Sequence, residues 1–423
     1  MSTTSIPGAL ALAFDDVFLV DGVRTPFVDY NGAFAPVSPT DLGIKAGREA
    51  LKRAGIAGAE IETVVAGNMA QASFDAYFLP RHVGLYCGAP VDVPAHLVQR
   101  ICGTGVEAIS QAADTISLGR AKVALAVGAE SMSRNPVAAY THRGGFRMGQ
   151  IEFKDFLWES LTDTACSVTM GGTAENLAKK YGITREEVDA FAARSFERAL
   201  KARDEGFFDD EIVPVSDETF ELAGYNNRSI KLAKRGEVVR EDSHVRPSPL
   251  DMLAKIRPAF GGVQTGGNSS AIVDGAAAVV LASGAYVRET AKTPLARVVA
   301  AASVGVPPEF MGIGPVPAIR AVCEKAGIRV ADVDRIEINE AFGAQIMACA
   351  RELGLDEEKL DVNGGAIAIG HPLGATGVRL TLTVSRELKR RGLRYGIASA
   401  CIGGGQGIAL LVENPAAARG ERP

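Results

Sequence analysis

Apolar residues along the chain gather in short runs separated by longer segments of helical spacing, which is typical of alternating strands and helices. Residues 17–20 and 61–65 are compact apolar runs of the strand type. Between them, a segment of helical pattern opens after Ser38, whose hydroxyl can cap the first N–H groups, and closes near Gly55. The order strand, helix, strand predicts a βαβ unit at the start of the chain.

The same order of elements returns later in the chain at a fixed spacing. Pro315 and Pro317 open a helical segment, and a strand-like run follows it at residues 333–338. One offset of 272 residues relates three pairs of segments: 54–56 to 326–328, 104–106 to 376–378, and 123–127 to the neighbourhood of 395–399. An offset shared by three separate elements predicts two similar α/β halves that pack together.

A long stretch between the two halves is not explained by this repeat. It combines helical segments, at residues 175–181 and 185–205, with a basic and aromatic segment at residues 142–148. Insertions of this size on a compact scaffold usually carry recognition, so we assign this one to substrate binding. Residues 274–281 are then expected to form a buried strand that returns to the first half.

The chain length also favours several structural units, because 423 residues exceed the roughly 250–300 at which one hydrophobic core stops growing. The N-terminal segment lacks a basic n-region and a cleavage site, so it is expected to be a flexible lead-in. The expected parts are a first half (15–132 plus 270–292), a loop domain (133–269), a second half (293–415) and flexible ends (1–14 and 416–423).

Composition narrows the choice of partners and compartment. The net charge is −5 and the basic residues are scattered, which argues against a nucleic-acid partner. Six cysteines without a CxxC pair indicate reduced thiols in a cytoplasmic protein. The sequence has no run of about 18 apolar residues, so no membrane span is expected.

Cys102 is the first candidate for chemistry. It precedes residues 103–105 and a helical segment whose apolar stripe begins at Val106. A thiol at a helix N-terminus feels the positive end of the helix dipole, which is expected to lower the pKa of the thiol from about 8.5. Cys102 is therefore a candidate nucleophile, with burial as a small apolar side chain as the alternative.

His371 is the second candidate. It lies within the glycine-rich segment 363–374. Glycines on both sides let the backbone approach a partner closely and hold the imidazole at a loop tip before a helix. Of the five histidines in the chain, this one alone has such a setting, so it is a candidate base. A solvent-facing loop histidine is the alternative.

Cys401 and Asn339 each follow a predicted strand. Cys401 precedes a glycine turn, residues 403–405, whose N–H groups can point at a developing oxyanion. Asn339 lies at the edge where ligands gather in open α/β sheets, although it can also serve as a helix cap. Because the two halves are related, the Cys102 and Cys401 loops lie at the ends of related elements and can meet at the junction.

The remaining cysteines and the glycine-rich segments suggest no cofactor. Cys87, Cys166, Cys323 and Cys349 lack a comparable setting and are interpreted as packing residues. No His, Cys and carboxylate cluster has metal spacing, and no P-loop or GxGxxG follows a strand. We therefore expect neither a metal ion nor a dinucleotide.

Four motifs together resemble those of the thiolase family, over residues 17–412. They are Cys102-Gly103-Thr104-Gly105, Asn339-Glu340-Ala341-Phe342, Gly370-His371-Pro372 and Cys401-Ile402-Gly403-Gly404-Gly405. Each motif alone is weak, and the four in this order at this spacing are specific. The resemblance implies a thiolase-like α/β fold, with two duplicated halves in five layers (αβαβα) and an inserted loop domain.

The resemblance also implies catalytic roles. Cys102 would be the acylated nucleophile, His371 the base that activates it, and Cys401 the acid/base at the acetyl α-carbon. Asn339 would hold a water that stabilises a thioester oxyanion together with His371. The N–H groups of Cys102 and Gly403 would form a second oxyanion site.

For binding, the resemblance implies CoA and acyl-CoA thioesters as substrates, with no bound cofactor. Ser270 matches a family position that contacts the pantetheine arm, and Met170, Phe260 and Phe342 are expected along the acyl and pantetheine channel. A homodimer or homotetramer is also implied.

The implied reaction is the reversible CoA-dependent cleavage of 3-ketoacyl-CoA to acetyl-CoA and a shortened acyl-CoA, in ping-pong order through an acyl-Cys102. A ketoacyl synthase on the same fold would pair one cysteine with two histidines, whereas this chain supplies one histidine and a second cysteine. A catalytically silent scaffold subunit is disfavoured by the intact set of Cys102, His371, Cys401 and Asn339.

Some positions depart from the family pattern. Thr104 stands where serine is usual, and Thr169 stands where many short-chain biosynthetic thiolases have histidine, which argues against a narrow acetoacetyl-CoA preference. The segment 220–245 is rich in basic residues, including Arg228, Lys231, Lys234 and Arg235. These residues either contact the CoA phosphates or form a solvated loop.

Overall fold

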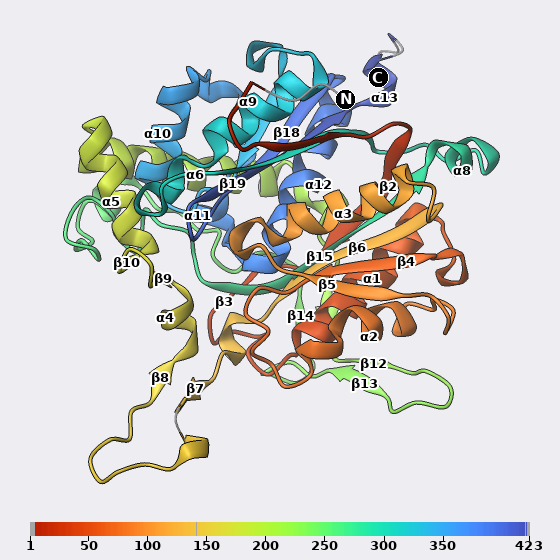
Figure 1. The fold of residues 1–423 in the computed structure, drawn as a ribbon, viewed down its shortest axis with the longest axis horizontal. Helices are drawn as coiled ribbons and strands as arrows, with labels where there is room; N and C mark the ends of the chain where they lie inside the picture. Colours follow the sequence, from red (N-terminus) through yellow and green to blue (C-terminus); the bar gives the residue numbers. More distant parts are fainter. Residues whose placement is uncertain (1–4, 141, 419, 421–423) are drawn as a thin grey trace.

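The computed structural model describes residues 5–140, 142–418 and 420, and its centre is a large mixed sheet. Figure 1 shows the strands crossing the middle of the molecule between layers of helices. In spatial order they are β17 (Arg335–Ile338), β18 (Tyr395–Ile402), β19 (Gln406–Glu413), β16 (Ala296–Gly305), β2 (Val17–Arg24), β15 (Val273–Ser283), β6 (Val123–Glu130), β4 (Thr63–Gly67) and β5 (Ala95–Val98).

The sheet consists of two related halves, as the sequence offset predicted. In the first half β2, β15, β6 and β4 lie side by side, and in the second half β16, β19, β18 and β17 do so in the same order. In both halves the last pair is parallel and the other two pairs are antiparallel. The halves join through β2 and β16, which pair only at Leu19 with Ala296 and at Phe18 with Arg297.

Helices complete five layers, which confirms the expected fold class. Helices α1 (Pro39–Ala54) and α2 (Leu79–Tyr86) pack on the outer face of the first half, and α9 (Pro315–Ala326) packs on that of the second. Helices α3 (Thr104–Ser117) and α12 (Leu373–Arg391) lie between the two halves (Figure 1). The ends of α1 follow the sequence signals: the Ser38 hydroxyl accepts from the Thr40 N–H at 3.1 Å, and Gly55 adopts a φ of 61°.

Two glycines allow the central helices to touch. A Cβ on Gly377 of α12 would lie 2.2 Å from the backbone nitrogen of Val106, and one on Gly105 of α3 would lie 2.6 Å from that of Val378. No side chain fits in such a contact. Because Cys102 precedes α3 and His371 precedes α12, this crossing brings the two loops together.

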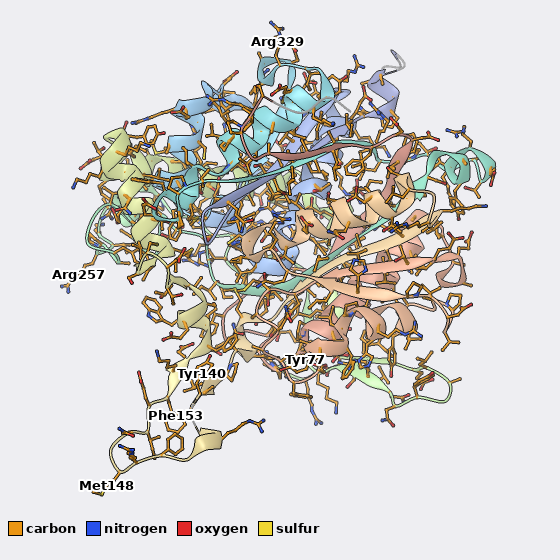
Figure 2. All side chains as sticks on the ribbon, viewed as in Figure 1. Tyr77, Tyr140, Met148, Phe153, Arg257 and Arg329 are labelled. Carbon is orange, nitrogen blue, oxygen red and sulfur yellow. The ribbon has the colours of Figure 1, made fainter. Side chains whose placement is uncertain are left out.

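The insertion between the halves contributes helices at one side of the molecule and a projecting arm. Helices α4 (Phe156–Ser160), α5 (Met170–Tyr181) and α6 (Arg185–Asp204) follow one another, and α5 begins earlier than predicted because the Thr169 hydroxyl caps it, accepting from the Gly172 N–H at 3.1 Å. Strands β7 (Val137–Ala138) and β8 (Lys154–Asp155) form the stem of an arm that reaches away from the body, with Met148 at its tip (Figures 1 and 2).

Part of the expected lead-in is structured. Residues 1–14 were expected to be flexible, but β1 (Leu10–Ala13) pairs antiparallel with β16, from Leu10 with Ser303 to Ala13 with Ala300. The physical reason is that β2 covers only the start of β16, so the remaining edge is open to another strand. At the other end, α13 (Pro415–Ala418) extends beyond residue 415. None of the described helices is long and apolar enough to cross a membrane.

Candidate active site

Cys102 lies in a tight turn where the two halves meet. Residues Ile101–Gly103 form a 3₁₀ turn ahead of α3, and Ile101 has a φ of 44°, which is unusual for a β-branched residue. The Thr104 hydroxyl supports the turn by donating to the Ile101 carbonyl at 2.7 Å and accepting from the Arg100 N–H at 2.9 Å. The predicted placement of Cys102 before a helix is therefore confirmed.

The expected drop in the thiol pKa is wrong for the free protein. Burial raises the pKa of Cys102 to about 11, although the backbone N–H groups of Gly403 and of Cys102 itself lower it, and nearby Glu130 raises it further. Burial therefore outweighs the effect of the helix start. The thiol keeps its proton at neutral pH until a base removes it.

Gly403 faces the Cys102 turn from the end of β18. A Cβ on Gly103 would lie 2.6 Å from Ile402 Cδ1, and one on Gly403 would lie 3.1 Å from the Met170 sulfur, so the turn and the strand end are closely packed. This packing directs the N–H groups of Gly403 and Cys102 to the same sulfur. Two converging N–H donors at a nucleophile are suited to stabilising an oxyanion.

His371 is buried and held at both ring nitrogens. Its Nδ1 lies 2.6 Å from Thr376 Oγ1 and its Nε2 lies 3.3 Å from Asn339 Nδ2. The Thr376 hydroxyl donates to the Pro372 carbonyl at 3.2 Å, so it accepts from Nδ1–H, and Nε2 keeps its lone pair. Burial lowers the pKa of His371 to about 3, and Arg379 lowers it as well. The imidazole is thus neutral and able to act as a base.

Asn339 is fully buried at the end of β17. Its Nδ2 faces His371, while its Oδ1 has no hydrogen-bond partner among the described residues. Asn339 is not a helix cap, because the next helix, α10 (Gly343–Leu353), has Phe342 at its N-cap position. A buried carbonyl oxygen without a partner indicates room for a polar group beside His371.

Cys401 is fully buried within β18, one residue from its end. Burial raises the pKa of its thiol well above the ordinary value, and the proximity of Cys102 and Cys349 raises it further. It packs with Met170 and Met311. The Cys102 and Cys401 loops therefore meet at the junction, as the duplication predicted.

A cavity of about 380 Å³ opens beside these groups, within the range of small-molecule sites. Phe260 and Phe342 meet edge to face in its wall, with ring centroids 6.1 Å apart. The cavity wall includes His371 and all four residues expected to bind substrate: Met170, Phe260, Ser270 and Phe342.

Cys102 lies behind this wall instead of forming part of it. It belongs to one buried apolar cluster with Met132, Leu157 and Leu373, and these three side chains line the cavity. Leu157 and its neighbour Trp158 belong to α4, which the sequence analysis did not single out. A five-residue helix has too few residues to show an apolar period, so no sequence signal marked it.

Glu130, at the end of β6, is a second residue that the sequence reasoning missed. Its carboxylate accepts hydrogen bonds at 2.9 Å from Asn68 Nδ2, from the Met69 N–H and from the Gly374 N–H at the start of α12. Burial raises the pKa of Glu130 to about 7, against the lowering effect of these N–H groups. The carboxylate holds the loop after β4 against the helix that follows His371.

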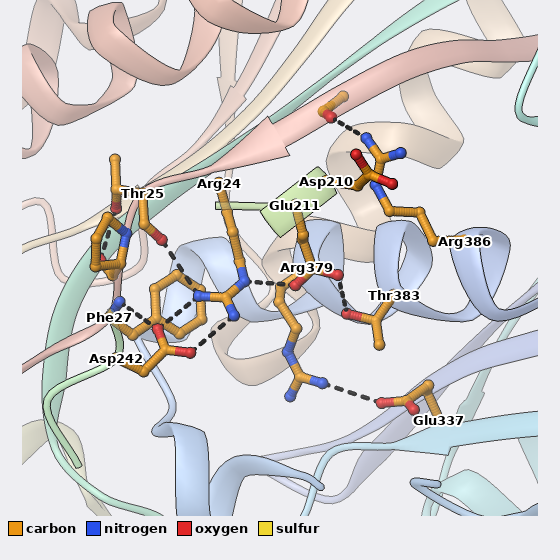
Figure 3. A network of polar contacts seen from close by, with 12 residues as sticks. Arg24, Thr25, Phe27, Asp210, Glu211, Asp242, Glu337, Arg379, Thr383 and Arg386 are labelled. Carbon is orange, nitrogen blue, oxygen red and sulfur yellow. Dashed lines mark hydrogen bonds and ion pairs between the residues drawn. The ribbon is translucent and has the colours of Figure 1, made fainter. Parts of the chain in front are cut away.

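A network of buried ion pairs fixes the insertion to the central helix (Figure 3). Arg24 pairs with Glu211 at 2.5 Å and with both oxygens of Asp242 at 2.6 and 2.8 Å. The Thr383 hydroxyl of α12 donates to Glu211 at 2.9 Å. Glu211 and Asp242, which belong to the insertion, are thereby held beside α12.

Three buried acidic residues, Glu337, Glu340 and Asp361, lie near Asn339. Glu337 pairs with Arg379 of α12 at 3.0 Å (Figure 3), yet burial raises the pKa of Glu337 to about 8 and that of Asp361 well above its ordinary value. Glu340, next to Asn339, accepts from the Ser195 hydroxyl at 2.7 Å and from the Ile367 N–H at 3.1 Å. It thereby ties the Asn339 turn to the segment that leads to His371.

The basic segment 220–245 does not reach the cavity. Arg228, at the start of β13 (Arg228–Ile230), pairs with Asp41 at 2.7 Å and with Asp75, so its charge is already engaged. Lys231, Lys234 and Arg235 are absent from the cavity wall as well. Part of the segment is folded and is not a solvated loop, because residues 228–230 form a strand and Ile230 and Leu232 are buried.

The described residues contain no group of three or more His, Cys, Asp or Glu side chains arranged to hold a metal ion. The six cysteines are all free. The side chains at the site supply a buried thiol in Cys102, a neutral imidazole in His371 and a second thiol in Cys401, with converging N–H donors.

Comparisons with known proteins agree with this arrangement. The thiolase N-terminal domain matches residues 17–285 and the thiolase C-terminal domain matches residues 292–414. The 3-ketoacyl-CoA thiolase, mitochondrial, of Homo sapiens is 43% identical over 404 residues, which cover 95% of this chain and 98% of that protein. The acetyl-CoA acetyltransferase of Syntrophomonas wolfei is 42% identical over 406 residues, which cover 94% and 99%.

Solved structures agree at the level of the fold. The crystal structure of human mitochondrial 3-ketoacyl-CoA thiolase in complex with CoA superposes with a TM-score of 0.89 at 42% identity, covering 95% of this chain and 99% of that one. The acetyl-CoA acetyltransferase of Bacillus anthracis gives a TM-score of 0.88, also at 42% identity, with the same coverage of 95% and 99%. With both halves matched and the identity sustained over nearly the whole length, the chain belongs to the thiolase family.

Proposed function

We propose that this protein is a thiolase, an acyltransferase that cleaves 3-ketoacyl-CoA with CoA to give acetyl-CoA and a shortened acyl-CoA, or runs the reverse condensation. The observation that carries the proposal is the Cys102 sulfur, which is faced by two N–H donors and lies at the junction that also holds neutral His371 and Cys401. The names of the relatives, 3-ketoacyl-CoA thiolase and acetyl-CoA acetyltransferase, support it.

In the first half-reaction, His371 Nε2 takes the proton of Cys102, and the thiolate attacks the 3-keto carbon of the substrate. The N–H groups of Cys102 and Gly403 stabilise the oxyanion that forms there. The carbon–carbon bond then breaks, and Cys401 gives its proton to the departing acetyl-CoA enolate. The acyl group stays on Cys102, and transfer of the proton from His371 to Cys401 restores both groups.

In the second half-reaction, free CoA takes the place of acetyl-CoA. His371 accepts the proton of the CoA thiol, whose sulfur attacks the acyl thioester. The bond between the acyl group and Cys102 then breaks, the shortened acyl-CoA leaves, and the Cys102 thiolate recovers a proton from His371. Asn339 and His371 act on the thioester oxygen through a bound water, for which the unpartnered Asn339 Oδ1 supplies an acceptor. Ser270 contacts the pantetheine arm, and Met170, Phe260 and Phe342, which line the cavity with it, form the channel for the acyl and pantetheine groups.

The test is an assay with acetoacetyl-CoA and CoA that follows the loss of the ketoacyl absorbance. Cys102→Ala is expected to abolish turnover, and intact-protein mass spectrometry should find an acyl adduct on the wild type only. Cys166→Ala is the matched control, because Cys166 is a half-buried thiol that does not line the cavity. Absence of activity on every chain length would contradict the proposal and favour a silent scaffold, whereas full activity of Cys102→Ala would contradict the role of Cys102 as the nucleophile.

We also propose that the protein is a homodimer or homotetramer. The support is at β5, an edge strand of the sheet, against which α2 packs. The segment that leads into α2 exposes three aromatic side chains, Phe74 by 82%, Tyr77 by 70% and Phe78 by 62% (Tyr77 in Figure 2). An apolar patch beside an open sheet edge is typical of a protein interface. Light scattering tests this, and a monomer at micromolar concentration would contradict it.

We further propose a cytoplasmic location and the three-part division given by the sequence, with residues 133–269 as the loop domain for CoA. Six free cysteines suit a reducing compartment. Several relatives carry the word mitochondrial in their names, so cell fractionation decides the location. Limited proteolysis tests the division, because CoA should protect the loop domain from cleavage.

A further inference from the structure

The two N–H donors that face the Cys102 sulfur come from different halves of the molecule. One belongs to the nucleophile turn, Ile101–Gly103, and the other to the glycine turn, residues 403–405. Donors of an oxyanion site act together only where both point at the same oxygen, which requires positions fixed to within about 0.5 Å. The site thus depends on the contacts that hold the two turns in register.

The glycine turn has few groups by which it can be held. All three of its residues lack a side chain, and Gly404 and Gly405 have φ values of 83° and 81°. The Val306 N–H donates to the Gly405 carbonyl at 2.7 Å, which fixes the far end of the turn within the second half. Gln406, which pairs with Ile402 across the turn, is the first residue after it with a side chain. A side chain of the first half can therefore bind this end of the turn through Gln406.

Arg100 makes this connection from the nucleophile turn. Its backbone supports the turn, because its N–H donates to the Thr104 hydroxyl at 2.9 Å and its carbonyl accepts from the Gly103 N–H at 2.8 Å. Its Nη1 donates to Gln406 Oε1 at 3.3 Å, and its Nε donates to the Glu107 carboxylate at 2.8 Å. One side chain thus joins the nucleophile turn to α3 and to the strand that follows the glycine turn.

The guanidinium of Arg100 is held in place on α3. Glu107 lies in the first turn of that helix, and its other oxygen accepts from Gln111 Nε2 at 2.9 Å, one turn further along. The side chains of Arg100 and Glu107 are only 26% and 13% exposed, so solvent screens their attraction less than that of a surface pair. The position of α3 is therefore carried through Arg100 to Gln406.

Apolar packing alone leaves the register of the two turns open. A Cβ on Gly103 would lie 2.6 Å from Ile402 Cδ1, so the turns are in close contact. Packing of this kind limits how closely the turns approach but not how they slide, because it has no preferred direction, whereas hydrogen bonds have one. The two side-chain bonds of Arg100 are directional, and they fix the sliding position.

This bridge lies outside the substrate cavity. Arg100, Glu107 and Gln406 line a separate hollow of about 340 Å³ beside the nucleophile turn, and none of the residues around that hollow lines the substrate cavity. The bridge therefore acts on the reaction through the two turns and not by touching the substrate.

We infer that Arg100 is a positioning residue for the proposed thiolase reaction. By joining Glu107 to Gln406, it holds the nucleophile turn and the glycine turn in register. The N–H groups of Cys102 and Gly403 therefore converge on the oxyanion. The inference rests on the proposed function, which supplies that oxyanion. Because the oxyanion forms only as the reaction proceeds, loss of the bridge should lower kcat and leave KM nearly unchanged.

The first experiment measures kcat and KM for acetoacetyl-CoA and CoA in two variants that break the bridge. Arg100→Met removes both side-chain bonds, and Gln406→Leu removes the one that joins the two turns. Each should lower kcat by about tenfold, less than the loss of a whole oxyanion donor, and should change KM by less than about twofold. Arg329→Met is the control and should keep the wild-type kcat, because the Arg329 side chain is 81% exposed and pairs with Asp332, three residues away (Figure 2).

A conservative variant separates positioning from loss of packing. Gln406→Glu keeps the length of the side chain and offers Arg100 a carboxylate, so kcat should stay within about twofold of the wild type. If urea denaturation shows that Arg100→Met does not fold, the two variants at position 406 carry the test. Wild-type kcat in Gln406→Leu, or equal losses in Gln406→Leu and Gln406→Glu, would overturn the inference and leave the proposed function intact.

Alkylation of Cys102 gives a readout that needs no turnover. The same two N–H groups stabilise the thiolate, so alkylation by iodoacetamide at mildly alkaline pH should slow by about threefold in Arg100→Met and Gln406→Leu. Cys166, a half-buried thiol, is the internal reference. Slower alkylation in both variants, beside a wild type that turns over no 3-ketoacyl-CoA, would contradict the proposed function alone. An active wild type, with kcat and alkylation unchanged in both variants, would contradict the positioning role alone.

Discussion

Gly105 and Gly377 lie against each other where α3 crosses α12. Because neither has a side chain, the backbone of each helix occupies the space that a side chain on the other would need. The same offset of 272 residues that relates the two halves also relates these two glycines. Two copies of one helix start therefore pack on each other at the centre of the molecule. Cys102 precedes one copy and His371 precedes the other, so the closeness of this contact sets how near the thiol and the imidazole can come.

The contact should not tolerate a methyl group. In Gly377→Ala the new Cβ would lie 2.2 Å from the Val106 nitrogen, so the helices must separate, and we expect a loss of about 3 kcal/mol in the free energy of unfolding. Urea denaturation measures this. Gly144→Ala is the control, because its Cβ would meet nothing within 4 Å. Equal stability of the two variants would contradict the role of the crossing.

Thr376 should act on catalysis through His371. Thr376→Val keeps the shape of the side chain but removes the hydroxyl that accepts from His371 Nδ1–H, so the ring loses the contact that sets its tautomer. We expect kcat to fall by roughly 100-fold while KM changes little. Thr376→Ser restores a hydroxyl and should recover most of kcat. Failure of serine to recover activity would indicate that the methyl group, and not the hydrogen bond, matters.

His371 should also control the reactivity of Cys102 without any substrate. Because burial raises the pKa of Cys102 to about 11, few thiolates exist at neutral pH unless a base assists. In His371→Ala, alkylation of Cys102 by iodoacetamide should slow by about 100-fold. Peptide mass spectrometry follows the reaction, with Cys166 in the same chain as the internal reference. Equal rates at Cys102 in both proteins would contradict the pairing.

Glu130 should stabilise the fold by accepting hydrogen bonds from buried backbone N–H groups. Glu130→Gln keeps one acceptor oxygen and turns an NH₂ group toward donors, so buried N–H groups of Met69 and Gly374 compete for what remains. We expect a loss of about 1–3 kcal/mol in the free energy of unfolding. Glu107→Gln is the control, since the Glu107 carboxylate forms a partly exposed pair with Arg100 at 2.8 Å. A variant at position 130 as stable as this control would contradict the prediction.

The free energy of unfolding should change with pH because Glu337 titrates. Burial raises the pKa of this carboxyl from 4.5 to about 8, so the folded chain holds a proton there that the unfolded chain releases. The resulting contribution to stability is complete below pH 4.5 and is lost as the pH rises through 8. Glu337→Gln cannot titrate, so its free energy of unfolding should decline less across this window. Urea titrations at several pH values measure both slopes, and identical slopes would contradict the assignment.

Much of the fold could be predicted from the sequence, because strands and helices in α/β units follow local patterns. The offset of 272 residues matches the first residues of β4 and β17, Thr63 and Arg335, and those of β6 and β18, Val123 and Tyr395. The meeting of the Cys102 and Cys401 loops also followed from the duplication, since related elements end at related places.

What could not be predicted depends on contacts between distant segments. The helix start near Cys102 is visible in the sequence, but burial is a tertiary property, and burial decides the pKa of the thiol. Glu130 ends an apolar strand, where a carboxylate is usually exposed, and only the approach of Gly374 from the second half encloses it. The place of Trp158 in the cavity wall likewise depends on how the insertion folds over the core.

The division of the site between the two halves has a consequence for the growing chain. Cys102 leaves the ribosome long before Asn339, His371 and Cys401 are synthesised, so the nascent polypeptide carries this cysteine without the imidazole that activates it. Thiolates, and not neutral thiols, are the targets of cellular electrophiles and oxidants. Placing nucleophile and base in different copies of the duplicated unit therefore leaves the nascent cysteine with only its ordinary reactivity, and the assistance of the base arrives once the second half has been translated.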